Sequence, residues 1–184
     1  NQTVTKTLFV GGEGSIRDMQ VPFTVSGTNG TLSQQPLDWH EYQARGYVFW
    51  APHDWVSLRA EYRWDRQVRS KDFNDGSTQV ETTRVPLGVG LFHPSGVSFN
   101  LTGTFTTQIG NFTGINDDRS RSGSDSFWLL DAGLSYRLPD RYGILMVGAT
   151  NLTDKNFYFH DTDPNNAIIQ PSRMVFARLT LALP

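Results

Sequence analysis

The sequence predicts an all-β fold: an antiparallel up-and-down transmembrane β-barrel of about eight strands that forms part of a larger barrel. Three observations favour this fold class. Apolar and polar residues alternate with period two in segments of about ten residues. The connections between these segments are alternately short and long. Aromatic residues make up 12% of the chain and fall near the segment ends. The whole chain, residues 1–184, is expected to form a single domain.

Composition and charge exclude several classes of protein. Ala, Leu, Glu and Lys are too sparse for a helical protein. A net charge of -2 without any Lys/Arg run gives no reason to expect nucleic acid as a partner. The absence of cysteine excludes disulfides, zinc-thiolate sites and thiol nucleophiles. A mean hydropathy of -0.40 is compatible with a barrel, because only every second strand residue would meet lipid.

Alternating segments predict strands, in chain order, at residues 3–10, 42–50, 55–65, 83–91, 97–106, 128–137, 144–152 and 174–183. The segment 55–65 is the clearest, because one of its faces would carry Val56, Leu58, Ala60, Tyr62 and Trp64. Its other face would carry Ser57, Arg59, Glu61, Arg63 and Asp65. Ten residues tilted by about 45° cover roughly 23 Å, close to the height of the apolar band of an outer-membrane barrel.

The predicted connections fall into two kinds. Short turns at 51–54, 93–96 and 138–142 each hold a proline with Asp or Gly nearby. Long loops are expected at 11–38, 67–78, 108–124 and 153–172, and they are rich in Asp, Asn, Ser and Gly. Short turns on one side and long loops on the other are typical of outer-membrane barrels.

Aromatic residues on the apolar faces are predicted to lie at the two membrane interfaces, where amphipathic rings prefer the headgroup level. They are Tyr42, Trp50, Trp64, Phe99, Phe105, Trp128 and Tyr136. The lipid bilayer is therefore an expected partner. The alternative is that these rings form the core of a soluble carbohydrate-binding β-sandwich.

Charged residues on the opposite faces are predicted to point into the lumen. They are Glu41, Arg45, Arg59, Glu61, Arg63, Asp65, Arg84, Asp131, Arg137 and Arg178. The arginines outnumber the carboxylates, and a basic lumen would favour an anionic small solute. The alternative is a self-neutralising network that sets the strand register and holds water.

No catalytic residue, cofactor or metal is expected, and the chain is interpreted as a protein that is not an enzyme. Glu61 and Asp65 would lie about 13 Å apart along one strand, too far for a glycosidase pair. Asp161 and Asp163 are weak candidates for calcium ligands, because oxygen donors alternate around them. Their loop lacks the glycine and the distal glutamate of an EF-hand.

The C-terminal stretch carries a more specific pattern. Residues 147–155 read VGATNLTDK, Tyr158 follows, and Pro171-Ser172-Arg173 precedes the last predicted strand. This pattern resembles the C-terminal end of TonB-dependent outer-membrane receptors. The resemblance implies a location in the bacterial outer membrane, energised uptake of a solute, and an energy-transducing periplasmic partner.

The chain also departs from that family. It contains no plug domain and no TonB box, and it ends at Pro184 instead of an aromatic residue. We therefore expect the C-terminal part of a longer barrel, or a relative that has lost the plug. Closure of eight strands on their own remains open, since the number is even. A porin-like or export barrel attached to a periplasmic helical-repeat domain is the other alternative.

Overall fold

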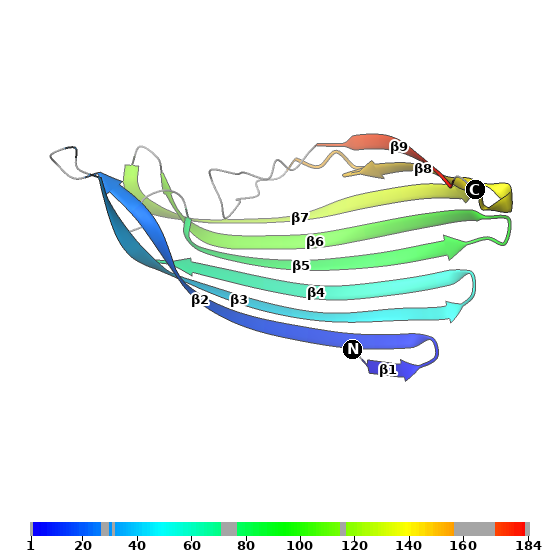
Figure 1. The fold of residues 1–184 in the computed structure, drawn as a ribbon, viewed down its shortest axis with the longest axis horizontal. Helices are drawn as coiled ribbons and strands as arrows, with labels where there is room; N and C mark the ends of the chain where they lie inside the picture. Colours follow the sequence, from blue (N-terminus) through cyan, green and yellow to red (C-terminus); the bar gives the residue numbers. More distant parts are fainter. Residues whose placement is uncertain are drawn as a thin grey trace.

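The computed structural model describes residues 2–26, 30, 32–70, 77–114, 117–156 and 172–182, in which one antiparallel β-sheet accounts for almost all regular structure. Strands that follow one another in sequence are neighbours in the sheet, in the order β1 to β9 (Figure 1). The all-β, up-and-down fold predicted from the alternation is confirmed. The strands are β1 (Gln2–Thr5), β2 (Leu8–Ser26), β3 (Leu32–His53), β4 (Val56–Arg69), β5 (Ser77–Phe92), β6 (Val97–Gly114), β7 (Asp117–Arg137), β8 (Gly143–Thr150) and β9 (Met174–Leu181).

The strand register keeps the alternation in phase from one strand to the next. Leu58 lies opposite Trp50 on β3 and opposite Val89 on β5, and Val89 in turn lies opposite Leu101 on β6. Opposed residues of antiparallel strands project their side chains from the same face. The separate alternating segments therefore add up to two continuous surfaces. We call the face that carries Leu58 the apolar face, and the face that carries Arg59 the polar face.

The N-terminal strand predicted at residues 3–10 is wrong. The chain turns at residues 6–7, and β1 folds back on β2 with Gln2 opposite Val10. Within the turn, the backbone N–H of Thr7 donates to the hydroxyl oxygen of Thr5. A two-residue turn preserves the period of the alternation, so the sequence on both sides reads as one strand. The sheet consequently has nine strands instead of eight.

Two of the four predicted long loops are also wrong over most of their length. β2 continues to Ser26 and β3 begins at Leu32, while β6 continues to Gly114 and β7 begins at Asp117. The loop predicted at 67–78 is shortened in the same way, since β4 ends at Arg69 and β5 begins at Ser77. These extensions contain apolar residues on both faces, among them Ile16, Leu37 and Ile109, but polar residues separate them. The sequence alternation is therefore unclear there, while the backbone pairing continues. Of the fourth loop, residues 157–171 lie outside the described part of the chain.

The two ends of the sheet differ. The turns around residues 54–55, 93–96 and 138–142 gather at one end, on the right in Figure 1. A short 3-10 helix, Pro139–Arg141, forms part of the last of these turns. At the opposite end the paired strands β2 and β3 extend farthest and bend away from the rest of the sheet (Figure 1). The predicted asymmetry of the connections is thus present, although long hairpins take the place of long loops.

The two edge strands of the sheet, β1 and β9, run in the same direction, because eight successive antiparallel pairings separate them. A closed barrel with only antiparallel neighbours needs an even number of strands. The strands from β2 to β9 number eight, and β9 runs antiparallel to β2, whose outer edge beyond residue 10 is unpaired within the described sheet. The described sheet is open, so closure of eight strands on their own stays a prediction.

The buried apolar side chains do not lie on the apolar face of the sheet. The buried apolar side chains Leu37, Val80 and Phe127 all lie on the polar face. On the apolar face, Leu58 is 37%, Leu87 46% and Leu179 58% exposed. The described residues contain no second layer that would cover these leucines. Among the same residues, no helix has the length and the apolar character needed to cross a bilayer.

The turn between β5 and β6 depends on Gly96. This residue has a φ of +91°, and a Cβ built on it would lie 2.9 Å from the carbonyl oxygen of Arg137. We predict that Gly96→Ala lowers the free energy of unfolding by about 1–3 kcal/mol, because alanine rarely adopts this φ. Gly46→Ala is the matched control, since its Cβ would meet nothing within 4 Å. Denaturant titration of both variants in detergent micelles measures the difference; equal stabilities would contradict this view of the turn.

Candidate functional site

The apolar face is the largest candidate surface of the molecule. The register places all seven predicted interface aromatics on it: Tyr42, Trp50, Trp64, Phe99, Phe105, Trp128 and Tyr136. Phe105 and Trp128 lie side by side on β6 and β7 with ring centroids 5.3 Å apart. Trp50 is 46% and Trp128 54% exposed. Contiguous exposed apolar area of this kind marks a surface that is covered by something else in the working protein.

The apolar face is bounded along the strands. On β6 the apolar stretch runs from Val97 to Phe105, about 26 Å at the usual rise per residue. Beyond it the same face becomes mostly polar, first at Thr83, which lies opposite Thr107, and then at Arg66, which lies opposite Glu81. Ile109, opposite Glu81 on β6, is an exposed apolar exception. The strands continue past this boundary without interruption. The apolar band therefore has a definite height. Phe105 and Trp128, which lie opposite each other, mark its boundary on the side away from the short turns.

The polar face carries the predicted charges. The register places all ten on this one face: Glu41, Arg45, Arg59, Glu61, Arg63, Asp65, Arg84, Asp131, Arg137 and Arg178. Arg45, Arg63 and Arg84 lie directly opposite one another on β3, β4 and β5. Like charges in opposed positions destabilise a sheet. This row therefore needs counter-charges close by.

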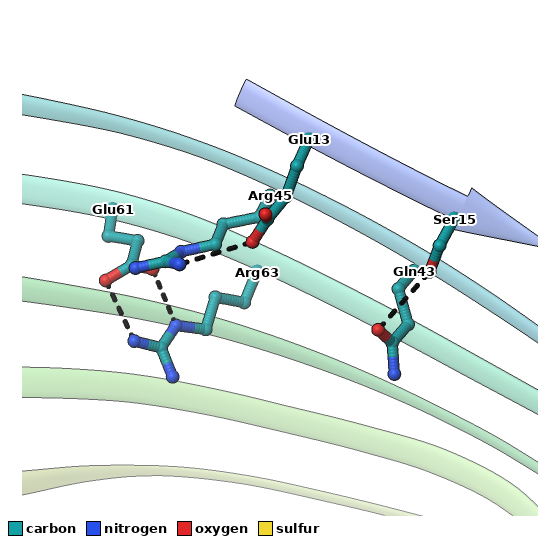
Figure 2. A network of polar contacts seen from close by, with 6 residues as sticks. All are labelled: Glu13, Ser15, Gln43, Arg45, Glu61 and Arg63. Atoms are coloured by element: carbon teal, nitrogen blue, oxygen red, sulfur yellow. Dashed lines mark hydrogen bonds and ion pairs between the residues drawn. The ribbon is translucent and has the colours of Figure 1, made fainter. Parts of the chain in front are cut away.

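Glu61 supplies the central counter-charge (Figure 2). Arg63 donates to both of its carboxylate oxygens, from Nε at 2.7 Å and from Nη2 at 3.0 Å. Arg45 donates to the same carboxylate through Nε, and to Glu13 on β2 through Nη1 at 3.2 Å. The side chain of Glu61 is only 9% exposed, whereas that of Glu13 is 67% exposed. The nearly buried carboxylate of Glu61 is thus a counter-charge that two opposed guanidinium groups share.

Polar contacts continue along the face away from this network. Arg17 pairs with Glu41 at 3.3 Å, and Gln67 donates to the same carboxylate at 3.2 Å. A hollow of about 480 Å³ lies beside the network, and its lining includes the side chains of Glu13, Ser15, Gln43, Arg45, Arg63, Asp65 and Arg84. Ser15 donates to Gln43 at 3.4 Å across this hollow (Figure 2). These contacts agree with a self-neutralising wall network, one of the two expectations for the polar face.

The sequence did not single out Glu13 and Arg17, because they fall in the segment predicted as a long loop. The glycines at 11, 12 and 14 interrupt the apolar period there, so the strand pattern of β2 is hidden. A usable signal was available, since Glu13, Ser15 and Arg17 are polar at alternate positions. The role of the ten predicted residues in lining a solute path stays a prediction.

The VGATNLTDK segment ends β8 in a tightly bonded turn around Asn151, whose φ is 47°. Asn151 is 3% exposed. Its side chain accepts from Lys155 N at 2.8 Å and donates to Lys155 O at 3.0 Å. Its backbone N–H donates to Asp131 on β7 at 2.9 Å, so this predicted lumen charge serves to hold the turn. Asp154 accepts from the backbone of Arg173, which directly precedes β9. The turn therefore links the end of β8 to the interior of β7 and to the start of β9.

Metal binding has no support in the part of the chain that the structure covers. Among the described residues, no group of three or more His, Asp or Glu side chains is arranged to hold a metal ion. The weak calcium candidates Asp161 and Asp163 lie outside the described residues.

We predict that Glu61→Gln lowers the free energy of unfolding by about 1–3 kcal/mol, because it leaves Arg45 and Arg63 opposed without their shared counter-charge. Glu13→Gln is the control, and its exposed pair should contribute about 0–1 kcal/mol. The double variant Glu61→Gln/Arg63→Gln should recover part of the loss. Chemical denaturation in micelles gives these values; an effect of Glu61→Gln no larger than that of Glu13→Gln would show that the bridge is unimportant.

Comparison with known proteins identifies no relative, since no family model, no curated protein and no solved structure matches this chain.

Proposed function

We propose that this chain forms part of the wall of a β-barrel in the bacterial outer membrane, with its apolar face against lipid and its polar face along the path of a solute. One observation carries the proposal: most of the exposed large apolar side chains lie on one face, while the buried apolar side chains lie on the charged face. Water around the apolar face would make this arrangement unfavourable, at about 25 cal/mol for each Å² of apolar surface. Hydrocarbon around it removes that cost.

The dimensions of the apolar face support the same proposal. A stretch of about 26 Å, tilted by about 40°, spans roughly 20 Å, which is comparable to the apolar band of about 25 Å in known outer-membrane barrels. Trp128 lies opposite Phe105 and Tyr136 opposite Val97, at the two ends of this stretch, where interfacial aromatic rings are expected. The polar continuation beyond Trp64 then corresponds to hairpins that project from the membrane on one side.

The described sheet has two open edges, and these edges indicate how large the complete barrel is. Unpaired backbone groups in hydrocarbon cost several kcal/mol each. β1 covers only residues 8–10 of β2, so the outer edge of β2 from Gly11 to Ser26 lacks a partner strand within the described sheet. We infer that further strands complete the wall, and that the nine strands described here are one arc of a larger barrel.

Energised uptake of the TonB-dependent kind is the form of transport that we favour. Its support is the resemblance of residues 147–155 to that family, together with the many contacts that Asn151 makes within this segment. An energy-transducing periplasmic partner is part of the same proposal. No described contact favours an export barrel with helical repeats. A carbohydrate-binding sandwich would need a second sheet over Leu58, Leu87 and Leu179, and the described residues form one sheet.

The proposal predicts that charge is tolerated differently on the two faces. Leu58→Arg and Leu87→Arg should each make folding into phosphatidylcholine vesicles less favourable by about 2–4 kcal/mol, because they place a charge in hydrocarbon. Arg59→Leu, next to Leu58 but on the polar face, should have a much smaller effect. Folding can be followed by tryptophan fluorescence and by the heat-dependent shift in gel mobility. Equal tolerance on both faces, or full solubility of the folded chain without detergent or lipid, would rule out the proposed membrane wall.

A further inference from the structure

An apolar hollow interrupts the polar face, on the side toward the short turns. Phe9 and Phe49 lie directly opposite each other on β2 and β3, and Phe49 lies opposite Arg59 on β4. Both rings are open to the surroundings, with Phe9 45% and Phe49 40% exposed. The same row of the sheet therefore presents two aromatic rings followed immediately by a guanidinium group.

Arg59 differs from three other arginines of this face in the partner of its guanidinium group. Arg17, Arg45 and Arg63 are each paired with a glutamate. Arg59 instead donates from Nη2 to the hydroxyl oxygen of Thr102 at 2.9 Å, and no carboxylate pairs with it among the described residues. A neutral hydroxyl leaves the positive charge of the guanidinium without compensation. The charge is thus available to an anion from outside the chain.

Gly88 makes this position of Arg59 possible. It lies opposite Arg59 on β5, and a Cβ built on it would be 2.5 Å from Nε and 2.8 Å from Cγ of Arg59. The arginine side chain consequently lies flat across β5 to reach Thr102 on β6. The hollow around it has a volume of about 500 Å³, and its lining includes Phe9, Phe49, Arg59, Asn100 and Met146 but no acidic residue. This volume falls in the usual range of small-molecule sites, roughly 300–1,000 Å³.

We propose that this hollow binds an amphipathic organic anion, with a flat apolar body against Phe9 and Phe49 and a carboxylate or sulfonate group on Arg59. Planar guanidinium groups bind such oxyanions through paired hydrogen bonds, and exposed aromatic rings favour a flat apolar body. The inference rests on the proposed function and deepens it, because it names the class of solute that the polar face would take. It places the selective contact where charge neutralisation of the wall is incomplete.

Naphthalene-2-sulfonate is a suitable probe, since it combines a flat apolar body with a permanent negative charge. The full chain is folded into phosphatidylcholine nanodiscs, and binding is measured by calorimetry against empty nanodiscs. We expect saturable binding of the sulfonate. Naphthalene-2-sulfonamide, which has the same body without the charge, should bind at least tenfold more weakly, and so should methanesulfonate, which lacks the rings.

Arg59→Gln should weaken sulfonate binding about tenfold or more, through loss of a charge-assisted hydrogen bond, and leave sulfonamide binding unchanged. Phe49→Ser should weaken both probes. Gly88→Ala keeps the charge but forces Arg59 off its path to Thr102, so it should also weaken the sulfonate. Arg66→Gln is the matched control, because it removes an arginine from the same strand at a position on the other face, and it should bind as the unmodified chain does.

The outcomes separate this inference from the proposed function. If the chain inserts into the nanodiscs but binds sulfonate and sulfonamide equally, or if Arg59→Gln binds the sulfonate as tightly as the unmodified chain, the anion site is wrong and the membrane wall stands. If the chain does not insert into lipid, both fail. Wild-type selectivity between the two probes decides the question even where a variant does not fold.

Discussion

Cross-strand register is the constraint on which the rest of this structure depends. Side chains alternate between faces with period two, so a slip of one residue between neighbouring strands would exchange the two faces of every strand beyond it. The register holds Leu58, Val89 and Leu101 in one row and Arg45, Arg63 and Arg84 in another. Both surfaces exist because these pairings agree across the whole sheet. A membrane wall needs this agreement more than a soluble sheet does, since an arginine on the lipid side is costly.

The polar face shows how charge can stabilise that register. Opposed arginines repel, and the nearly buried Glu61 turns two of them into a bridge between β3 and β4. This bridge needs Arg45 and Glu61 on the same face, so it disfavours a slip of one residue, which would move Arg45 to the other face. Arg59 lies outside the bridge and has only a hydroxyl partner. On our account, the arginines paired with glutamates support the wall, and Arg59 interacts with the solute.

The sequence predicts those parts of the fold in which the two faces differ chemically. It identifies the strand segments from 42 to 137 and assigns their residues to the correct faces, because apolar side chains at alternate positions leave a clear pattern. It misses the extensions of β2, β3, β6 and β7, where polar residues are frequent on both faces and no clear alternation marks the strand. It also misses the turn at residues 6–7. Which charges meet, as in the contact of Glu13 with Arg45, depends on a register that no single segment specifies.

The contact between the apolar face and hydrocarbon can be measured directly by site-directed spin labelling of β6 in phosphatidylcholine vesicles. Single nitroxides at positions 99–104 would be tested for collision with oxygen, which concentrates in lipid, and with a water-soluble nickel complex. Our account predicts oxygen maxima at Phe99, Leu101 and Gly103 and nickel maxima at Asn100, Thr102 and Thr104. Nickel maxima at Leu101 and Gly103, or the absence of any alternation, would contradict a lipid-facing apolar surface.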